Sequence, residues 1–389
     1  MNNIVIRIIT GLIGVVVLGA IAGGVYWFFV SSETSSDDAS SESFFARTFR
    51  PLFGVDVPTD VTPPQSTSTP TTSTGLPRFF QVWPEPVAGA YAFGASTTDI
   101  VRVVDAGTGH LFDVSLENGE ARRVTNTTIP GIMHVHWRGA DSLIVQYINS
   151  GSVDTVRSFN ATVVYPETTA ASTDVVGELV GEFLPDNIDV LATHNDQFAY
   201  MIDGRLVYNN QTIFESPLHG WQLDWIDDST LLVTSNASSE TDGIAYRVTT
   251  SGVVTRIIEP TRALTARADE GVLLMSSGID IFVQTSNEES DVYFDVQALP
   301  EKCISDSAVR VVCGTSIQLP TIQNLPEVWY QGVLHFTDTL WEIDTVTGEA
   351  VEIGIPQQAF DIVPLSVAPN TNAVLFSDKT TGTAWVYFR

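Results

Sequence analysis

Residues 365–376 read LSVAPNTNAVLF, a short apolar run followed by a polar turn and a second apolar run. Two such runs around a turn that holds Pro and Asn predict a pair of antiparallel β-strands. The pattern recurs six more times, whereas helical periodicity is not sustained after residue 77. The other copies are AYAFGASTTDIVRVV (90–104), HVHWRGADSLIVQY (134–147), LATHNDQFAYMI (191–202), LDWIDDSTLLVT (223–234), LTARADEGVLLM (264–275) and CISDSAVRVVC (303–313). The chain from residue 77 onwards is therefore predicted to be all-β and repetitive.

Prolines mark the spacing of these copies. One proline precedes each copy, and the seven are Pro86, Pro130, Pro185, Pro217, Pro260, Pro300 and Pro356. Their mean spacing of about 45 residues is typical of the four-stranded blades of a β-propeller. Most copies continue into a third strand with an aromatic residue, as in GHLFDVSL and TLWEIDT.

The two ends of the repeat region complement each other. Only 33 residues follow Pro356, which is one strand short of a blade, and PRFFQVW (77–83) precedes the first copy without a blade of its own. We therefore predict a seven-bladed β-propeller over residues 77–389, closed by PRFFQVW pairing beside the carboxyl-terminal AWVYFR. Such closure removes exposed sheet edges, which are prone to aggregate.

The amino-terminal stretch is predicted to be a membrane anchor. Residues 8–30 read IITGLIGVVVLGAIAGGVYWFFV and carry no charge. A helix of this length reaches about 34 Å, enough for a hydrocarbon core of about 30 Å. Arg7 before it and acidic residues after it place residues 1–7 in the cytoplasm and the rest outside. A cleaved signal peptide is the alternative, but its apolar region is usually shorter.

A linker is predicted between the anchor and the repeats. Residues 31–76 are rich in Ser, Thr, Pro and Asp, and they lack the apolar side chains that would offset the entropy of ordering. One exception is residues 43–53, SFFARTFRPLF, with four phenylalanines and two arginines. This segment is either a short interfacial helix against lipid headgroups or a patch that docks on the folded domain, and the sequence leaves both open.

Charge and motifs exclude several functions. Lys and Arg number 18 against 46 Asp and Glu, a net charge of −28, which disfavours nucleic acid as a partner. The chain has no GxSxG nucleophile elbow, HExxH, phosphate-binding loop or GxGxxG. His134 and His136 share one strand face and could form half of a metal site, but no third ligand is indicated nearby. We expect no cofactor and no metal, and we predict no catalytic residue.

The two cysteines lie on one predicted hairpin. Cys303 and Cys313 are ten residues apart, and outside the cytoplasm they are expected to pair across the two strands. The alternative is two buried free thiols. A disulfide requires a register that brings the α-carbons within about 7 Å.

One long insertion is a candidate binding segment. Residues 314–338 lie between a predicted second and third strand, on the face where the blade-to-blade loops emerge. Trp329 and Tyr330 are candidate binding residues there, because aromatic side chains dominate binding hot spots. The alternative is a lid that packs its own aromatic side chains on the blade.

The repeat pattern resembles the degenerate WD40-like repeat of TolB-type propellers. Ser366–Asn370, SVAPN, is nearest to the Ser-Pro-Asp-Gly turn of that family. More closely, the chain is similar to uncharacterised membrane-anchored propellers of candidate-phylum bacteria. The shared stretches are EPVAG (85–89), NTTIPG (126–131), FLPDNI (183–188), LPEKC (299–303) and WYQG (329–332). The resemblance implies the fold and a location in the cell envelope, but no activity.

The sequence thus predicts a single-pass protein of the cell membrane with its propeller outside the cytoplasm. Its expected role is that of a binding or scaffolding module, whose partner is an envelope protein or polymer. The alternative is a glycan-active enzyme with paired carboxylates at the mouth of the propeller channel, and a third possibility is a structural spacer. The sequence leaves the question of catalysis open.

Overall fold

The computed structural model describes residues 75–149, 151, 155–166, 175–236, 238–284, 291–316 and 324–389. They fall within one compact unit, residues 67–389. The predicted cytoplasmic tip 1–7, the anchor 8–30, the segment 43–53 and most of the linker 31–76 lie outside the described residues. Within the ranges given above, no helix is both long and apolar enough to cross a bilayer.

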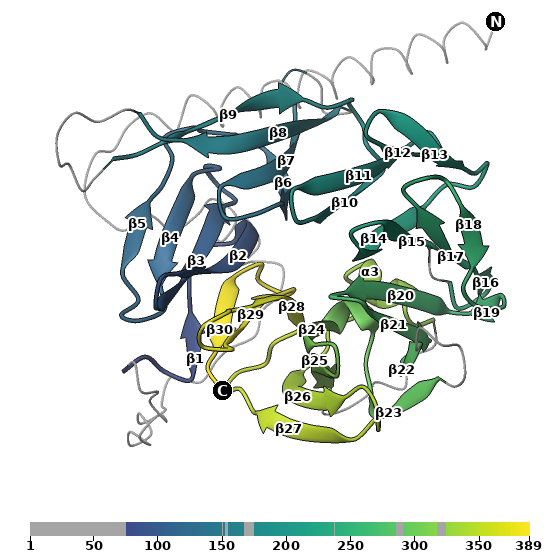
Figure 1. Ribbon diagram of the computed structural model, residues 1–389. Helices are drawn as coiled ribbons and strands as arrows, with labels where there is room; N and C mark the ends of the chain where they lie inside the picture. Colours follow the sequence, from purple (N-terminus) through teal and green to yellow (C-terminus); the bar gives the residue numbers. More distant parts are fainter. Residues whose placement is uncertain are drawn as a thin grey trace, which may run out of the picture. The chain divides into compact units, whose positions relative to one another are not determined.

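Seven four-stranded antiparallel sheets form a ring (Figure 1). The first blade holds β2 (Val87–Ala95), β3 (Thr98–Asp105), β4 (Leu111–Ser115) and β5 (Ala121–Arg123). The second holds β6 (Ile132–Trp137), β7 (Ser142–Ile148), β8 (Val156–Val164) and β9 (Glu178–Phe183). The third holds β10 (Val190–His194), β11 (Gln197–Ile202), β12 (Arg205–Tyr208) and β13 (Gln211–Glu215).

The next three blades follow the same order. The fourth holds β14 (Trp221–Asp227), β15 (Thr230–Ser235), β17 (Ala245–Thr249) and β18 (Val254–Arg256), with a two-stranded pair of β16 (Asp242–Gly243) and β19 (Thr261–Arg262) beside it. The fifth holds β20 (Leu264–Asp269), β21 (Val272–Ser277), β22 (Asp280–Gln284) and β23 (Val292–Gln297). The sixth follows the 3-10 turn η1 (Pro300–Lys302) and holds β24 (Cys303–Ser307), β25 (Arg310–Ser316), β26 (Asp338–Asp344) and β27 (Ala350–Gly354). The helix α3 (Glu327–Tyr330) lies between β25 and β26.

The seventh blade combines both ends of the described chain. It holds β28 (Ile362–Val367), β29 (Val374–Asp378) and β30 (Ala384–Tyr387), and its outermost strand is β1 (Phe79–Gln81). The register places Phe79 opposite Tyr387 and Gln81 opposite Trp385. The prediction of an all-β, seven-bladed propeller closed by an amino-terminal strand is confirmed.

The core consists of clusters between neighbouring blades. Val101 and Val103 of the first blade pack with Leu375 and Val386 of the seventh, and these four are at most 1% exposed. Full burial of such a side chain contributes about 1.5–3 kcal/mol, so each blade is stabilised mainly by its neighbours. Gly89 lies where the first blade meets the second. A Cβ there would lie 2.8 Å from the Cβ of Val135, so only glycine fits this approach.

Candidate functional site: the channel at the centre of the ring

A cavity of about 1140 Å³ lies along the channel at the centre of the ring. Its lining comes from the first strands of six blades, namely β2, β6, β10, β20, β24 and β28, and from the turns that follow these strands. Those turns join the first and second strand of each blade, so we call this end of the channel the hairpin end. Because strands alternate in direction, the connection that carries α3 emerges at the opposite end.

Polar side chains can occur on these first strands because each has a partner strand on one side only. Their inner side faces the channel, where water and neighbouring polar groups can solvate a charge. The first strands accordingly interrupt their apolar runs with Tyr91, His134, Asp224 and Arg267.

Three aromatic side chains form a surface that we call the aromatic ledge, made of Tyr91, Phe93 and Trp137. Tyr91 is stacked on Trp137, with ring centroids 5.8 Å apart and planes 22° apart. Tyr91 and Phe93 are also nearly parallel, with centroids 6.3 Å apart. All three are half-buried and line the cavity. Burial, and then the charge of Glu270 on the fifth blade, raise the pKa of the Tyr91 hydroxyl. Glu270 lines the same cavity.

The channel histidines His136 and His194 each lie within hydrogen-bond distance of a polar side chain. Burial lowers the pKa of His136 to about 4, so this ring is neutral at pH 7, and its Nε2 lies 3.1 Å from Oε1 of Gln146. His194 lies 2.9 Å from Asp228. Among the described residues, no group of three or more His, Cys, Asp or Glu side chains is arranged to hold a metal ion.

Two acidic side chains lie beside the channel wall. Asp224 on β14 is half-buried, and burial raises its pKa to about 7, with Glu301 adding to the effect and Arg267 opposing it. Burial also raises the pKa of Glu301, against a hydrogen bond from the Tyr330 hydroxyl. Arg267 donates to the carbonyl oxygens of Glu301 (3.3 Å) and Cys303 (3.2 Å) and also lines the cavity. Arg267 therefore links the channel lining to the main chain at Glu301. We refer to Asp224 and Glu301 as the acidic pair.

Replacing Asp224 by asparagine is expected to stabilise the protein above pH 7. The pKa of Asp224 is higher in the folded state than in the unfolded chain, so the folded state holds the extra proton and stability falls as pH rises from about 4 to 7. Asp224→Asn removes this cost and should raise the free energy of unfolding by about 2 kcal/mol at pH 8, with little change at pH 4. Denaturant unfolding at both pH values measures this.

Asp227 on the same strand is the matched control for that experiment. Asp227 is exposed, and although desolvation acts in the opposite direction, hydrogen bonds from the N–H and hydroxyl of Ser229, both 2.8 Å, lower its pKa. Asp227→Asn should therefore lower stability at pH 8, the opposite sign. Equal effects of the two substitutions would contradict the assignment of Asp224 as a carboxyl group strained by burial.

Trp329, one of the two candidate binding residues, lies in the interior. It is 3% exposed and packs with Leu299 and Phe336. Its indole N–H donates to both carboxylate oxygens of Asp361, at 3.1 and 3.0 Å. This burial favours the interpretation in which the insertion packs its own aromatic side chain on the blade.

Tyr330, the other candidate, is 36% exposed, and its hydroxyl donates to Glu301. The two candidates therefore have different environments. Trp329 is part of the core, whereas Tyr330 contacts the acidic pair beside the channel. Neither residue lines the cavity at the hairpin end.

Cys303 and Cys313 face each other on β24 and β25 and are joined by a disulfide, with α-carbons 4.0 Å apart. Both are fully buried in the cluster between the fifth and sixth blades. Disulfides persist mainly in proteins outside the cytoplasm.

The solved structures that this chain resembles share little sequence identity with it. No known family matches the chain, and no curated protein matches it. Among solved structures, it is similar to virginiamycin B lyase from Staphylococcus aureus, with 11% identity, a TM-score of 0.47 and coverage of 78% of this chain and 98% of that one. It is also similar to oligogalacturonate lyase from Vibrio parahaemolyticus, with 11% identity, a TM-score of 0.47 and coverage of 81% and 94%.

A gluconolactonase from Xanthomonas campestris is more distant, with 10% identity, a TM-score of 0.37 and coverage of 79% and 88%. The protein is a seven-bladed β-propeller on the evidence of its own strand order, and the resemblance to TolB-type propellers stays a prediction.

The channel residues Tyr91, Trp137 and Arg267, and Asp224 beside the channel wall, were not predicted from the sequence. A signal was present, because each interrupts or ends the apolar run of a first strand, where a fully buried strand would keep apolar residues. Which of these residues converge depends on the order of blades around the ring.

Proposed function

We propose that this protein is a tethered binding module of the cell envelope, whose channel takes up a segment of a polymer at the hairpin end. The observation that carries the proposal is the cavity of about 1140 Å³ with the aromatic ledge on one side and charged residues on the other. Large concave sites with apolar walls and a few placed polar groups are the usual ligand sites of proteins.

The chemistry of the lining favours a glycan segment as the ligand. A pyranose ring has a C–H face that packs on an aromatic ring and a rim of hydroxyl groups that need hydrogen-bond partners. The nearly parallel rings of Tyr91 and Trp137 provide an aromatic surface for the C–H face. Hydrogen-bond partners for the hydroxyl groups come from Asp269, Glu270 and Arg267.

The proposed location rests on three features. The uncharged stretch 8–30 has the length of a membrane span, and the Ser/Thr/Pro-rich residues 31–76 suit a tether. The Cys303–Cys313 disulfide supports an oxidising compartment. A tether would keep the channel at high local concentration near envelope polymers.

Tyr91→Ala is expected to weaken glycan binding at least tenfold. Loss of the central ring of the ledge removes most of the stacking area, which corresponds to about 1.4 kcal/mol or more. Titration calorimetry of the full-length protein with fragments of envelope glycans measures the effect. Tyr293→Ala, on the outer strand β23 where Tyr293 is 62% exposed, is the control and should bind normally. Normal binding by the Tyr91 variant would contradict the proposed site.

The acidic pair supports a second candidate function, that of a glycan-active enzyme. Asp224, with its pKa near 7, could donate a proton to a leaving oxygen while a second carboxylate acts on the opposite side of the bond. Product analysis after incubation with a glycan panel tests this candidate. Turnover that Asp224→Asn abolishes, with glycan binding retained, would favour the enzyme over the binding module.

A further inference from the structure

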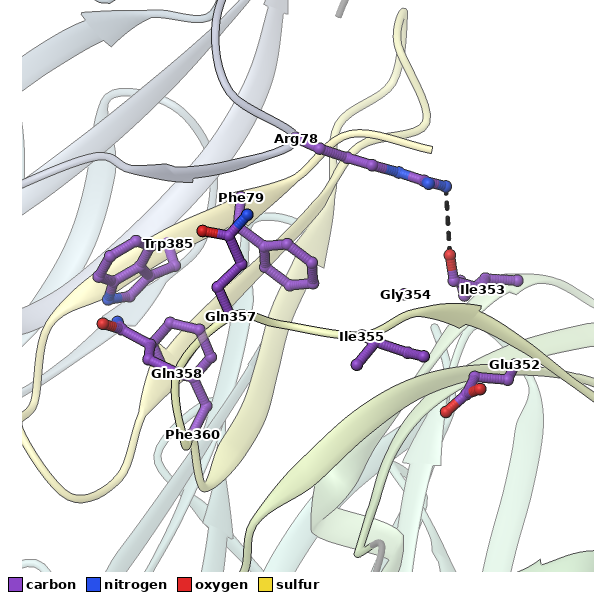
Figure 2. A pocket seen from close by; sticks show the side chains of 10 residues that line it. All are labelled: Arg78, Phe79, Glu352, Ile353, Gly354, Ile355, Gln357, Gln358, Phe360 and Trp385. Carbon is purple, nitrogen blue, oxygen red and sulfur yellow. Dashed lines mark hydrogen bonds between the residues drawn. The ribbon is translucent and has the colours of Figure 1, made fainter. Parts of the chain in front are cut away.

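A second cavity, of about 490 Å³, lies where the ring closes. Three segments that are remote in sequence form it. Phe79 begins β1 and Arg78 directly precedes it, Trp385 comes from β30, and residues 352–360 come from the end of β27 and the link to β28 (Figure 2). Its volume is within the range of small-ligand sites, and it is separate from the channel lining.

The floor of this cavity is an aromatic corner. Phe360 is 2% exposed, whereas Phe79 and Trp385 are half-buried. The rings of Phe360 and Trp385 are 4.9 Å apart and tilted by 59°. Phe79 is closer to parallel with Phe360, with centroids 6.3 Å apart and planes 26° apart. The three rings thus meet at different angles and enclose a corner, which suits a compact apolar side chain.

Three exposed polar side chains surround the corner. The side chains of Gln357, Gln358 and Glu352 make no hydrogen bond with any described residue. Figure 2 shows the Gln357 side chain extending toward Phe79. A carboxamide both donates and accepts, so it matches the N–H and C=O groups of a peptide backbone.

Hydrogen bonds from two of its three guanidinium nitrogens position the Arg78 side chain. Its Nε donates to the Phe388 carbonyl at 3.2 Å, and its Nη2 donates to the Ile353 carbonyl at 3.2 Å and to the Tyr387 hydroxyl at 2.6 Å. Its Nη1 has no partner among the described residues. A positioned guanidinium with a free donor is a site for a carboxylate.

The adjoining strand is an unpaired sheet edge with exposed apolar side chains. β27 is the outermost strand of its sheet; Val351 within it and Ile355 directly after it are each 65% exposed. Edge strands add extended peptides through main-chain hydrogen bonds, and an adjacent pocket supplies specificity.

We propose that this closure pocket binds an extended peptide segment of another protein, with an apolar side chain in the aromatic corner and an adjacent carboxylate on Arg78. The carboxylate is either an acidic side chain or a chain terminus, since both present the same group. The site is independent of the glycan site proposed above.

Three short peptides test the proposal on the full-length protein by ligand-observed NMR. Acetyl-Gly-Val-Phe with a free carboxylate and acetyl-Gly-Phe-Asp-amide should bind, with dissociation constants of roughly 1 mM or below for so small an interface. Acetyl-Gly-Val-Phe-amide should bind at least fivefold more weakly than the better of the two. Whichever charged peptide binds more tightly identifies the source of the carboxylate.

The combined variant Gln357→Ala, Gln358→Ala should weaken peptide binding about tenfold, because it removes the carboxamides that hydrogen-bond the peptide backbone. Both side chains are exposed, so the variant should fold normally. Gln211→Ala on β13 is the matched control, and Tyr91→Ala should leave peptide binding unchanged. The proposal is overturned if the amidated peptide binds as tightly as the charged ones, if cellobiose binds in preference to all three, or if the glutamine variant binds normally.

Discussion

Lys302→Met should lower the free energy of unfolding by about 3–5 kcal/mol, the largest effect we expect of a single substitution. Lys302 is 1% exposed, and its Nζ lies 2.6 Å from Asp338 and 2.5 Å from Asp361. Both carboxylates are fully buried, so among the described residues loss of the ammonium leaves Asp338 without an ion-pair partner and Asp361 with only His335, whose Nδ1 is 3.5 Å away. Asp361 also holds the indole of Trp329, and the insertion should therefore loosen as well.

Two further variants separate this cause from a general loss of packing. Lys302→Met combined with Asp338→Asn and Asp361→Asn removes the uncompensated charge and should recover a large part of the loss. Arg262→Met breaks an exposed ion pair with Asp242, at 3.4 Å, and should cost less than 1 kcal/mol. Urea unfolding at pH 7 measures all three. A loss for Lys302→Met as small as that for Arg262→Met would contradict the network.

Removal of β1 is expected to have a comparably large effect. A chain that begins at residue 84 lacks Phe79, Phe80 and Val82, which pack in the clusters on either side of the seventh blade. Burial of three such side chains contributes about 5 kcal/mol, similar to the whole stability of many domains. The deletion also exposes the edge of β30, which favours aggregation.

Thermal unfolding and gel filtration of two truncated chains measure the contribution of β1 to stability and to resistance against aggregation. The chain that begins at residue 75 keeps β1 and should be monodisperse, with a cooperative transition. The chain that begins at residue 84 should aggregate or melt at a much lower temperature. Identical behaviour of the two would show that β1 does not contribute to the seventh blade.

The fold could be predicted because its signals are local and repeated. Each first hairpin carries two apolar runs and a turn, and a proline before each copy sets the period of about 45 residues. The residues after Pro356 are one strand too few for a blade, so the seventh blade needed a strand from elsewhere. Residues 77–83 were the one apolar segment of the repeat region not assigned to a blade. The facing positions of Cys303 and Cys313 follow from the same hairpin pattern.

The sites could not be predicted because their residues meet only through the ring. Lys302 and Asp361 are 59 residues apart in the sequence but form an ion pair. Trp329 donates to the same carboxylate from an insertion that has no repeat pattern. The closure pocket joins residues near 78, 355 and 385. The aromatic ledge joins two blades, so Tyr91 and Trp137 could not be paired from spacing alone.

Circular closure is most directly tested by an engineered crosslink between β1 and β30. Gln81 and Trp385 lie opposite each other. They form a non-hydrogen-bonded pair, because the backbone hydrogen bonds join the neighbouring pairs, such as Val82 and Ala384. Opposed α-carbons at such positions are about 4.5 Å apart, within the span of a disulfide. Gln81→Cys with Trp385→Cys should form an intramolecular disulfide under mild oxidation, detected by peptide mapping, whereas Gln81→Cys with Gln211→Cys on the third blade should not. Two thiols that stay free in the first variant, or that pair only between molecules, would contradict the closed ring.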